Sequence, residues 1–188
     1  MADRSNWRDL LDASLAKSDR STPFVQLATV DPSGSPAVRT VVFRTFLEPG
    51  SRLCFGTDLR SAKVEQITAH PVAAVCWYFT ATREQYRLTG RLEVVRSNIG
   101  GVLSEERARV WASLSETARQ VYSWPPPGEP LADAGEFTRP APVVPPACFG
   151  VLVLNPEHVD YLDVKTQPHQ RTIFQLVAGA WIADPVNP

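Results

Sequence analysis

The sequence predicts a mainly β protein with flanking helices, folded as an antiparallel barrel or sandwich. Short apolar runs rich in Val, Phe and Thr recur along the 188 residues, separated by turn residues such as Pro, Gly and Asp. This pattern is typical of short antiparallel strands. Hydrophobic residues make up 44% and charged residues 21% of the chain. That ordinary globular balance favours a single domain over residues 1–188.

The N-terminal part reads as one helix followed by three strands. The Trp and Leu side chains of residues 6–17 recur at helical spacing, and Asn6 suits the N-cap position. Apolar runs bounded by turn residues then predict strands. These strands are Phe24–Val30, Ala37–Phe46 and Leu53–Phe55. The turn signals between them are Asp31-Pro32-Ser33-Gly34 and Glu48-Pro49-Gly50.

The remainder of the chain alternates between helical and strand patterns. The turn after residue 56 predicts a helix at 61–69, and apolar residues near the 3.6-residue period predict one at Ser104–Tyr122. The predicted strands are Val72–Thr80, 84–95, Phe149–Leu154, Val159–Val164 and Arg171–Val177. Asn155-Pro156-Glu157 is expected to form a turn between two of these strands.

Residues 123–147 contain 8 of the chain's 17 prolines. Proline lacks the N–H group that a sheet ladder needs, so this segment cannot lie inside a sheet. Trp124, Phe137 and the pair Val143-Val144 are too apolar for a purely solvated linker. We therefore predict an ordered proline-rich excursion that packs over the barrel or over a partner subunit.

Charge and cysteine spacing argue against several functional classes. The formal net charge is −1, and no Lys/Arg cluster supports a barrel that binds single-stranded nucleic acid. No apolar run approaches the ~20 residues of a membrane span, and MADRSNWRDLLDASL lacks a signal core. A cytoplasmic location is expected. Cys54, Cys76 and Cys148 lack metal-ligand spacing, so no metal site is expected.

Candidate binding residues concentrate between Arg39 and Lys63. Arg60, Ser61 and Lys63 fall where a helix would begin. A helix N-terminus with free N–H groups, a hydroxyl and nearby cations suits a phosphate monoester. The alternative is a solvated turn in which Ser61 is simply an N-cap.

Arg39 and Arg44 flank the apolar run Val41-Val42-Phe43. Because they are five positions apart, an undisturbed strand would point them to opposite faces. They can share a small site only if a bulge or twist intervenes, or they serve different groups of one ligand.

Four motifs in order resemble the pyridoxamine 5′-phosphate oxidase family. They are R-T-V-V-x-R, F-x-T-D-x-x-S-x-K-x-x-Q-I, H-P-x-A-A and R-x-Q-x-R-x-x-G-x-x-E. The resemblance covers residues 24–96 and resumes more weakly at 149–185. It implies an FMN-binding split β-barrel with antiparallel, Greek-key-like connections, and a homodimer with FMN at the subunit interface.

The resemblance also implies roles for single residues. Arg39 would contact the FMN phosphate, the Val41–Val42 backbone would lie along the isoalloxazine ring, and Arg44 would approach ring and substrate. Arg60 is a candidate for the charge that relatives carry where this chain has Ala62. Arg171 would be donated to the flavin across the dimer. The other positions matched to cofactor contacts are Thr40, Thr57, Ser61, Lys63, Gln85 and Tyr161.

The substrate side departs from the family pattern. Relatives that oxidise pyridoxamine phosphate use a tyrosine, an arginine and a serine where this chain has Trp111, Ser115 and Arg119. Their arginine–x–histidine pair corresponds to Gln167 and His169. We therefore expect a divergent branch of the family, with Arg44, Trp111, Ser115, Arg119 and His169 as candidate substrate residues.

The leading functional hypothesis is an FMN-dependent oxidoreductase with an unidentified small-molecule substrate. No side-chain general base is evident, so hydride transfer through flavin N5 is the simplest expected chemistry. The alternative is a non-catalytic protein that binds flavin, deazaflavin or haem, because related split barrels include such members.

Overall fold

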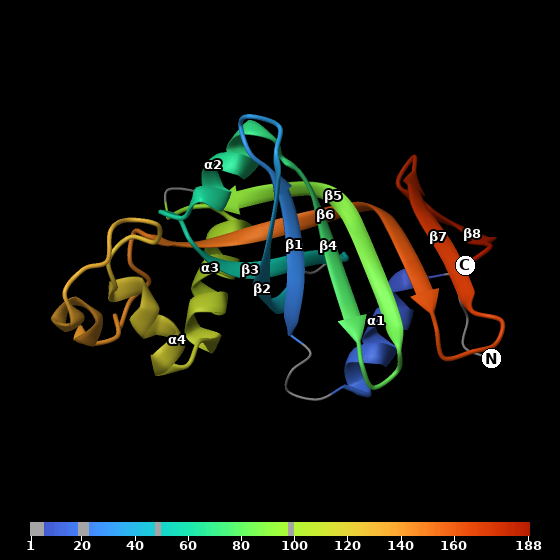
Figure 1. The fold of residues 1–188 in the computed structure, drawn as a ribbon, viewed down its shortest axis with the longest axis horizontal. Coiled ribbons are helices and arrows are strands. Elements are labelled where there is room, and N and C mark those ends of the chain that lie inside the picture. Colours follow the sequence, from blue (N-terminus) through green and yellow to red (C-terminus); the bar gives the residue numbers. More distant parts are fainter. Residues whose placement is uncertain (1–5, 19–22, 48–49, 98–99) are drawn as a thin grey trace.

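The computed structural model describes residues 6–18, 23–47, 50–97 and 100–188 (Figure 1). In this part of the chain the sheet order is β3-β2-β1-β4-β5-β6-β7-β8, and an additional pairing of β3 with β6 closes a six-stranded antiparallel barrel. The strands are β1 (Phe24–Val30), β2 (Pro36–Leu47), β3 (Arg52–Asp58), β4 (Val72–Phe79), β5 (Glu84–Val95), β6 (Phe149–Asp163), β7 (Gln170–Val177) and β8 (Ala180–Val186). The order β3-β2-β1-β4 is that of a Greek key. The predicted fold class is confirmed.

Short helices surround the barrel. The α-helices are α1 (Trp7–Ala16), α2 (Ala62–Ala69), α3 (Val102–Ser113) and α4 (Glu116–Gln120), and the 3₁₀ helices are η1 (Val121–Ser123) and η2 (Ala134–Thr138). The side chain of Asn6 accepts a hydrogen bond from the backbone N–H of Arg8, so the expected cap of α1 is present. No helix in the described ranges is long and apolar enough to cross a membrane.

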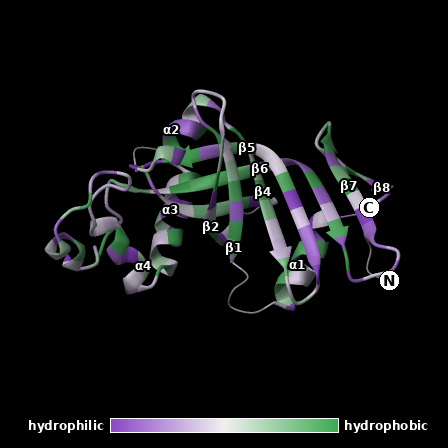
Figure 2. Cartoon of the chain, viewed as in Figure 1, coloured by the Kyte–Doolittle hydropathy of each residue, from purple (hydrophilic) through white to green (hydrophobic). Residues whose placement is uncertain are grey.

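Two apolar clusters hold the barrel together. The first fills the interior and includes Trp77, Phe55 and Tyr86, with α1 and α2 contributing Leu11 and Ile67. The second packs α3 against the outer side of β3 and β6. Successive side chains of a strand point to opposite faces of the sheet. Figure 2 accordingly shows hydrophobic and hydrophilic residues interspersed along the strands.

The expected turn at Asn155–Glu157 is wrong, because β6 continues through it. Residues on both sides of this point pair with β5, and the register shifts between Thr89 and Gly90, which leaves Glu157 as the extra residue of a bulge. Gly90 makes the bend possible. A Cβ atom there would lie 2.0 Å from the carbonyl oxygen of Asn155. The bend lets β6 pair with β3 along its first half and with β7 along its second half.

The expected single helix at Ser104–Tyr122 is also wrong. Helix α3 ends at Ser113, and Ser115 caps a new helix by accepting a hydrogen bond from the N–H of Ala118 at 3.3 Å. The guanidinium of Arg119 folds back onto the α3 carbonyls of Trp111 and Ala112. Arg119 of α4 thus satisfies carbonyl groups at the C-terminal end of α3 and stabilises the break between the two helices. Apolar periodicity alone does not reveal such a contact.

A strand at the C-terminus was missed by sequence reasoning. Strand β8 pairs with β7 through a hairpin in which Ala178 and Gly179 both have positive φ. Pro185 obscured it, and the edge position of β8 explains why a proline is tolerated there. Of the turn expected at Glu48–Gly50, the first two residues lie outside the described residues.

The proline-rich segment is ordered, and it packs against α3 and α4. The indole Nε1 of Trp111 donates to the carbonyl of Val143, and the amide of Gln120 donates to that of Arg139. Trp124 and Phe137 form an edge-to-face pair with centroids 5.7 Å apart. In Figure 1 the segment lies beyond α4, at the end of the molecule opposite β7 and β8.

Candidate functional site

Two cations from separate elements meet at the start of α2. Arg39 of β2 donates to the hydroxyl of Thr29 at 2.6 Å and to the side-chain oxygen of Gln66 at 2.7 Å. Lys63 donates to the hydroxyl of Ser61 at 2.7 Å. The Ser61 hydroxyl itself donates to the carbonyl of Asp58 and makes no capping bond to α2. Ser61 therefore occupies the N-cap position of α2 but does not cap the helix through its side chain.

The electrostatics of this pair favour an anionic ligand. Burial lowers the pKa of Lys63, and the positive charge of Arg39 lowers it further, while Asp58 partly opposes both effects. Burial also lowers the pKa of Arg39. Neither cation forms a salt bridge with a carboxylate in the described part of the chain. Two like charges held near each other without a salt-bridge partner among the described residues fit a phosphate dianion.

A cavity opens beside these groups. Its volume is about 410 Å³, and Ser61 and Lys63 lie on one wall. Trp124, Phe137 and the prolines between them form the opposite wall. Sequence reasoning missed this wall as part of the site. The apolar Trp124 within a proline-rich stretch was the sequence signal that could have indicated this wall.

Arg60 does not add a free charge to this cavity. Its guanidinium forms a salt bridge with Asp58 at 2.6 Å, and that hydrogen bond raises the pKa of Arg60. It also donates to the carbonyl of Trp124 at 3.0 Å, which ties the proline-rich wall to β3. Arg60 therefore braces the wall, and its role as a substitute for the charge absent at Ala62 stays a prediction.

Thr57, another candidate cofactor residue, lies next to Asp58 and is buried on the barrel side of β3.

Arg44 occupies a bulge between β2 and β3. The register shifts between Phe43 and Thr45, so Arg44 is the extra residue. Its Nε atom is buried and has no hydrogen-bond partner in the described residues. A Cβ built on Gly56 would lie 3.8 Å from that Nε and 3.4 Å from the hydroxyl of Tyr122. Burial lowers the pKa of Arg44. The bulge named as one condition for a shared site is therefore present at Arg44, and the surroundings of Arg44 differ from those of Arg39.

Four of the other candidate cofactor residues, Thr40, Val42, Gln85 and Arg171, share the outer face of the sheet. Register partners lie on the same face of an antiparallel pair. Thr40 is opposite Gln26, and Gln85 is opposite Leu162, which is opposite Arg171. Val42 lies two positions along from Thr40 on this face, whereas Val41 points into the barrel core.

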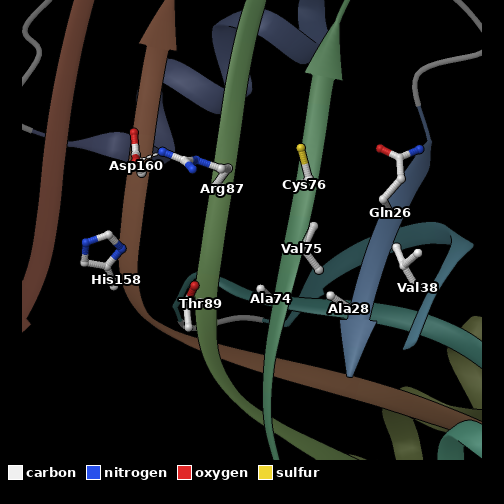
Figure 3. A pocket seen from close by; sticks show the side chains of 10 residues that line it. All are labelled: Gln26, Ala28, Val38, Ala74, Val75, Cys76, Arg87, Thr89, His158 and Asp160. Carbon is white, nitrogen blue, oxygen red and sulfur yellow. Dashed lines mark hydrogen bonds and ion pairs between the residues drawn. The ribbon is translucent and has the colours of Figure 1, made fainter. Parts of the chain in front are cut away.

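This outer face carries several exposed apolar side chains and is hollowed. Phe24, Val38, Val72 and Tyr78 are exposed on it. A cavity of about 340 Å³ lies among small side chains such as Ala28, with Arg87, His158 and Asp160 along one side (Figure 3).

Several candidate residues have structural partners in this fold. Tyr161 is buried in the barrel core, and its hydroxyl donates to Glu84 at 2.7 Å. Trp111 is buried against Tyr122 and Phe149, with centroids 5.6 and 4.9 Å away. As described above, Ser115 and Arg119 cap helices. Within one chain these side chains therefore make structural contacts, and their role at a substrate stays a prediction.

The two halves of the predicted site lie apart. His169 and Arg171 border a cavity between β7 and β8, and the ring Nδ1 of His169 lies 3.0 Å from the carbonyl of Thr166. In Figure 1, β7 and α2 are well separated along the long axis of the molecule. A single chain therefore does not bring Arg171 to the cavity beside Lys63.

Comparison with known proteins identifies relatives along the whole chain. The family model described as pyridoxamine 5′-phosphate oxidase, FMN-binding domain, matches residues 4–96. An Arabidopsis thaliana protein named pyridoxine/pyridoxamine 5′-phosphate oxidase 2 is 38% identical over 97% of this chain and 96% of its own length.

Two solved structures resemble this chain over nearly its whole length. A pyridoxamine 5′-phosphate oxidase-related, FMN-binding protein of Nostoc punctiforme has a TM-score of 0.93 and 37% identity, covering 99% of this chain and 100% of its own. PhzG of Burkholderia lata, in complex with tetrahydrophenazine-1-carboxylic acid, has a TM-score of 0.75 and 19% identity over 96% of this chain and 89% of its own. At that identity the second likeness concerns the fold alone.

Proposed function

Because the chain belongs to the FMN-binding pyridoxamine 5′-phosphate oxidase family and FMN is its cofactor, we propose that it is an FMN-dependent oxidoreductase acting on a small molecule. The observation that carries the proposal is the pair Arg39 and Lys63. Both are desolvated, both lack a carboxylate partner among the described residues, and Lys63 lines an open cavity. A cytoplasmic location remains a prediction.

The residues of this chain bind and orient the cofactor. Arg39, Ser61 and Lys63 hold the phosphate through charge-assisted hydrogen bonds. Thr40, Val42 and Gln85 line the face that receives the ring, and Arg171 supplies positive charge at the ring of a neighbouring copy. FMN, when bound, supplies the redox chemistry by hydride transfer at N5. No side chain among the described residues is assigned as a general base for this step.

The functional unit in this proposal is a homodimer with FMN between the subunits. The separation of Lys63 from Arg171 within one chain supports it, because the site is incomplete without a second copy. The apolar outer face that carries Phe24, Val38 and Tyr78 is the surface that the second copy would cover.

Pyridoxamine phosphate is proposed to be a poor substrate. A phosphorylated substrate needs charge-assisted partners that position its reacting carbon. Trp111 is buried, and the donors of Arg119 are turned to backbone carbonyls. The name of the Arabidopsis relative favours the opposite outcome, so the assay is decisive.

The test starts from the FMN-loaded protein, under air, with pyridoxamine phosphate and a panel of other amines and reductants. We expect full FMN occupancy and a kcat/KM for pyridoxamine phosphate well below ~10⁴ M⁻¹s⁻¹. A value at or above that level would make the protein a vitamin B6 oxidase. Failure to bind FMN at all would overturn the cofactor site itself.

The second candidate function is a flavin carrier without fast turnover. The observation that favours it is that Trp111, Ser115 and Arg119 all serve the α3–α4 junction instead of a pocket. Anaerobic photoreduction followed by admission of oxygen and candidate acceptors separates the two functions. A carrier would reoxidise at the same rate whichever organic acceptor is added.

A further inference from the structure

A carboxylate on the outer face of the sheet is shared by two arginines. Asp160 of β6 accepts hydrogen bonds at Oδ1 from Nε of Arg171 at 3.0 Å and at Oδ2 from Nη2 of Arg171 at 2.8 Å. Oδ2 also accepts from Nη2 of Arg87 on β5 (Figure 3). These three residues, the Arg87–Asp160–Arg171 cluster, span the neighbouring strands β5, β6 and β7.

The side-on contact fixes the orientation of Arg171. Binding through Nε and Nη2 holds the guanidinium plane in one geometry. It leaves Nη1 unused, since no partner for that atom occurs in the described residues. The side chain of Asp160 is 7% exposed, whereas that of Arg171 is 31% exposed. The carboxylate is therefore an inner support, and the guanidinium is the group offered to a ligand.

The charges of the cluster do not cancel. Two guanidinium groups share one carboxylate, which leaves the cluster itself with a net positive charge. Burial raises the pKa of Asp160, but the hydrogen bond from Arg171 and the charges of Arg87 and Arg171 outweigh it and lower that pKa overall. Asp160 thus stays ionised at neutral pH and continues to hold Arg171.

Stability alone gives little reason for this arrangement. Backbone ladders already join β5, β6 and β7. Burying a carboxylate carries a desolvation cost, and apolar residues of similar size often stabilise a fold as well as a buried ion pair does. A buried ionic group that leaves one arginine edge free fits a role in positioning.

We propose that Asp160 is a positioning residue that holds Arg171 ready to donate from its free edge to the electron-rich pyrimidine edge of the flavin bound by a second copy of the chain. This inference rests on the proposed function, because the role of Arg171 at the flavin is part of it. It adds a residue that touches no cofactor itself and that acts only through Arg171.

The test is a double-mutant cycle on FMN affinity, measured by quenching of flavin fluorescence with the dimeric protein. Arg171→Ala should weaken binding roughly 10- to 100-fold. Asp160→Asn should weaken it by about 3- to 10-fold in the wild-type background and have no further effect in the Arg171→Ala background. The visible circular dichroism of bound FMN should change in the same way in both single variants.

Controls separate positioning from general destabilisation. Glu106→Gln removes another buried carboxylate with an arginine partner, Arg109, but on helix α3. It should leave FMN affinity unchanged. Asp160→Glu keeps the charge and moves it by one methylene, and it should show a smaller loss that again vanishes without Arg171. That variant provides the measurement if Asp160→Asn does not fold.

Two results would overturn the inference. The first is an Asp160→Asn effect that persists undiminished in the Arg171→Ala background. The second is unchanged FMN affinity in Asp160→Asn while Arg171→Ala binds weakly. If Arg171→Ala itself binds FMN normally and Lys63→Ala does not, the proposed role of Arg171 fails and the phosphate site stands.

Discussion

At the residue scale, Lys63 combines burial with a neighbouring like charge. Its ammonium group loses solvation and lies near the guanidinium of Arg39, and both effects lower its pKa. A folded protein maintains such a group at a cost in stability. A bound phosphate would neutralise the positive charge of both cations at once. Lys63 should therefore destabilise the apoprotein and stabilise the FMN complex.

Lys63→Ala should therefore weaken FMN binding. Loss of one charge-assisted contact to a phosphate costs on the order of 1.5–3 kcal/mol, or roughly ten- to a hundred-fold in affinity. Titration of apoprotein with FMN, followed by fluorescence, measures the change. Lys165→Ala, which removes an exposed lysine beyond β6, is the matched control. Equal FMN affinity in Lys63→Ala and wild type would mean that the phosphate lies elsewhere.

The same substitution should stabilise the apoprotein, and the gain should depend on pH. The folded-state pKa of Lys63 lies below the unfolded value of 10.5, so the penalty is fully present below the folded pKa. Between the two pKa values the unfolded chain binds the proton and the folded chain does not. Stability from this group therefore rises with pH in that window.

Urea unfolding of the two apoproteins at neutral pH and near pH 10 checks this behaviour. The advantage of Lys63→Ala over wild type should shrink as the pH rises. An advantage that stays constant across the window would show that the lysine charge is not its cause.

At the element scale, the bend of β6 depends on Gly90. A side chain at this position would meet the backbone of Asn155, which cannot move without disturbing the β5–β6 ladder. Gly90→Ala should destabilise the fold by about 1–3 kcal/mol or more, as overpacking does. Thermal or urea unfolding measures the loss. Gly135→Ala is the control, because nothing lies within 4 Å of a Cβ there and its φ is unremarkable.

The junction of α3 and α4 gives a second prediction at this scale. Ser115 caps α4, so Ser115→Ala should cost about 0.5–1 kcal/mol, whereas Ser115→Asn should retain the cap. Neither change should alter FMN affinity. If Ser115→Ala left stability unchanged but reduced turnover of an identified substrate, the candidate substrate role from the sequence would be restored.

At the scale of the whole molecule, the proposed site needs two chains. A mixture of Lys63→Ala and Arg171→Ala protomers should form hybrid dimers in which one site has both mutations and the other has neither. After equal mixing and exchange, about a quarter of all sites should regain wild-type affinity. Titration at low FMN concentration detects them. A site built within one chain would show no recovery.

Much of the architecture was predictable from the sequence. Period-two and period-3.6 patterns placed β1, β2, β5 and α1 close to their observed bounds. The ordered motifs between residues 24 and 96 pointed to the family and to FMN, which the comparisons bear out. Such patterns are local, because a strand or helix needs only its own apolar spacing and its end signals to be recognised.

What only the tertiary structure decided depends on residues far apart in sequence. The spacing of Tyr161 and Trp111 marks apolar faces but does not say what lies opposite. Tyr161 is buried inside the barrel, and Trp111 is buried where α3 packs on its outer side. The continuity of β6 required Gly90, and the cluster around Asp160 required three strands in register. Contacts of this kind are set by which elements pack together, and a local pattern carries no information about its distant partner.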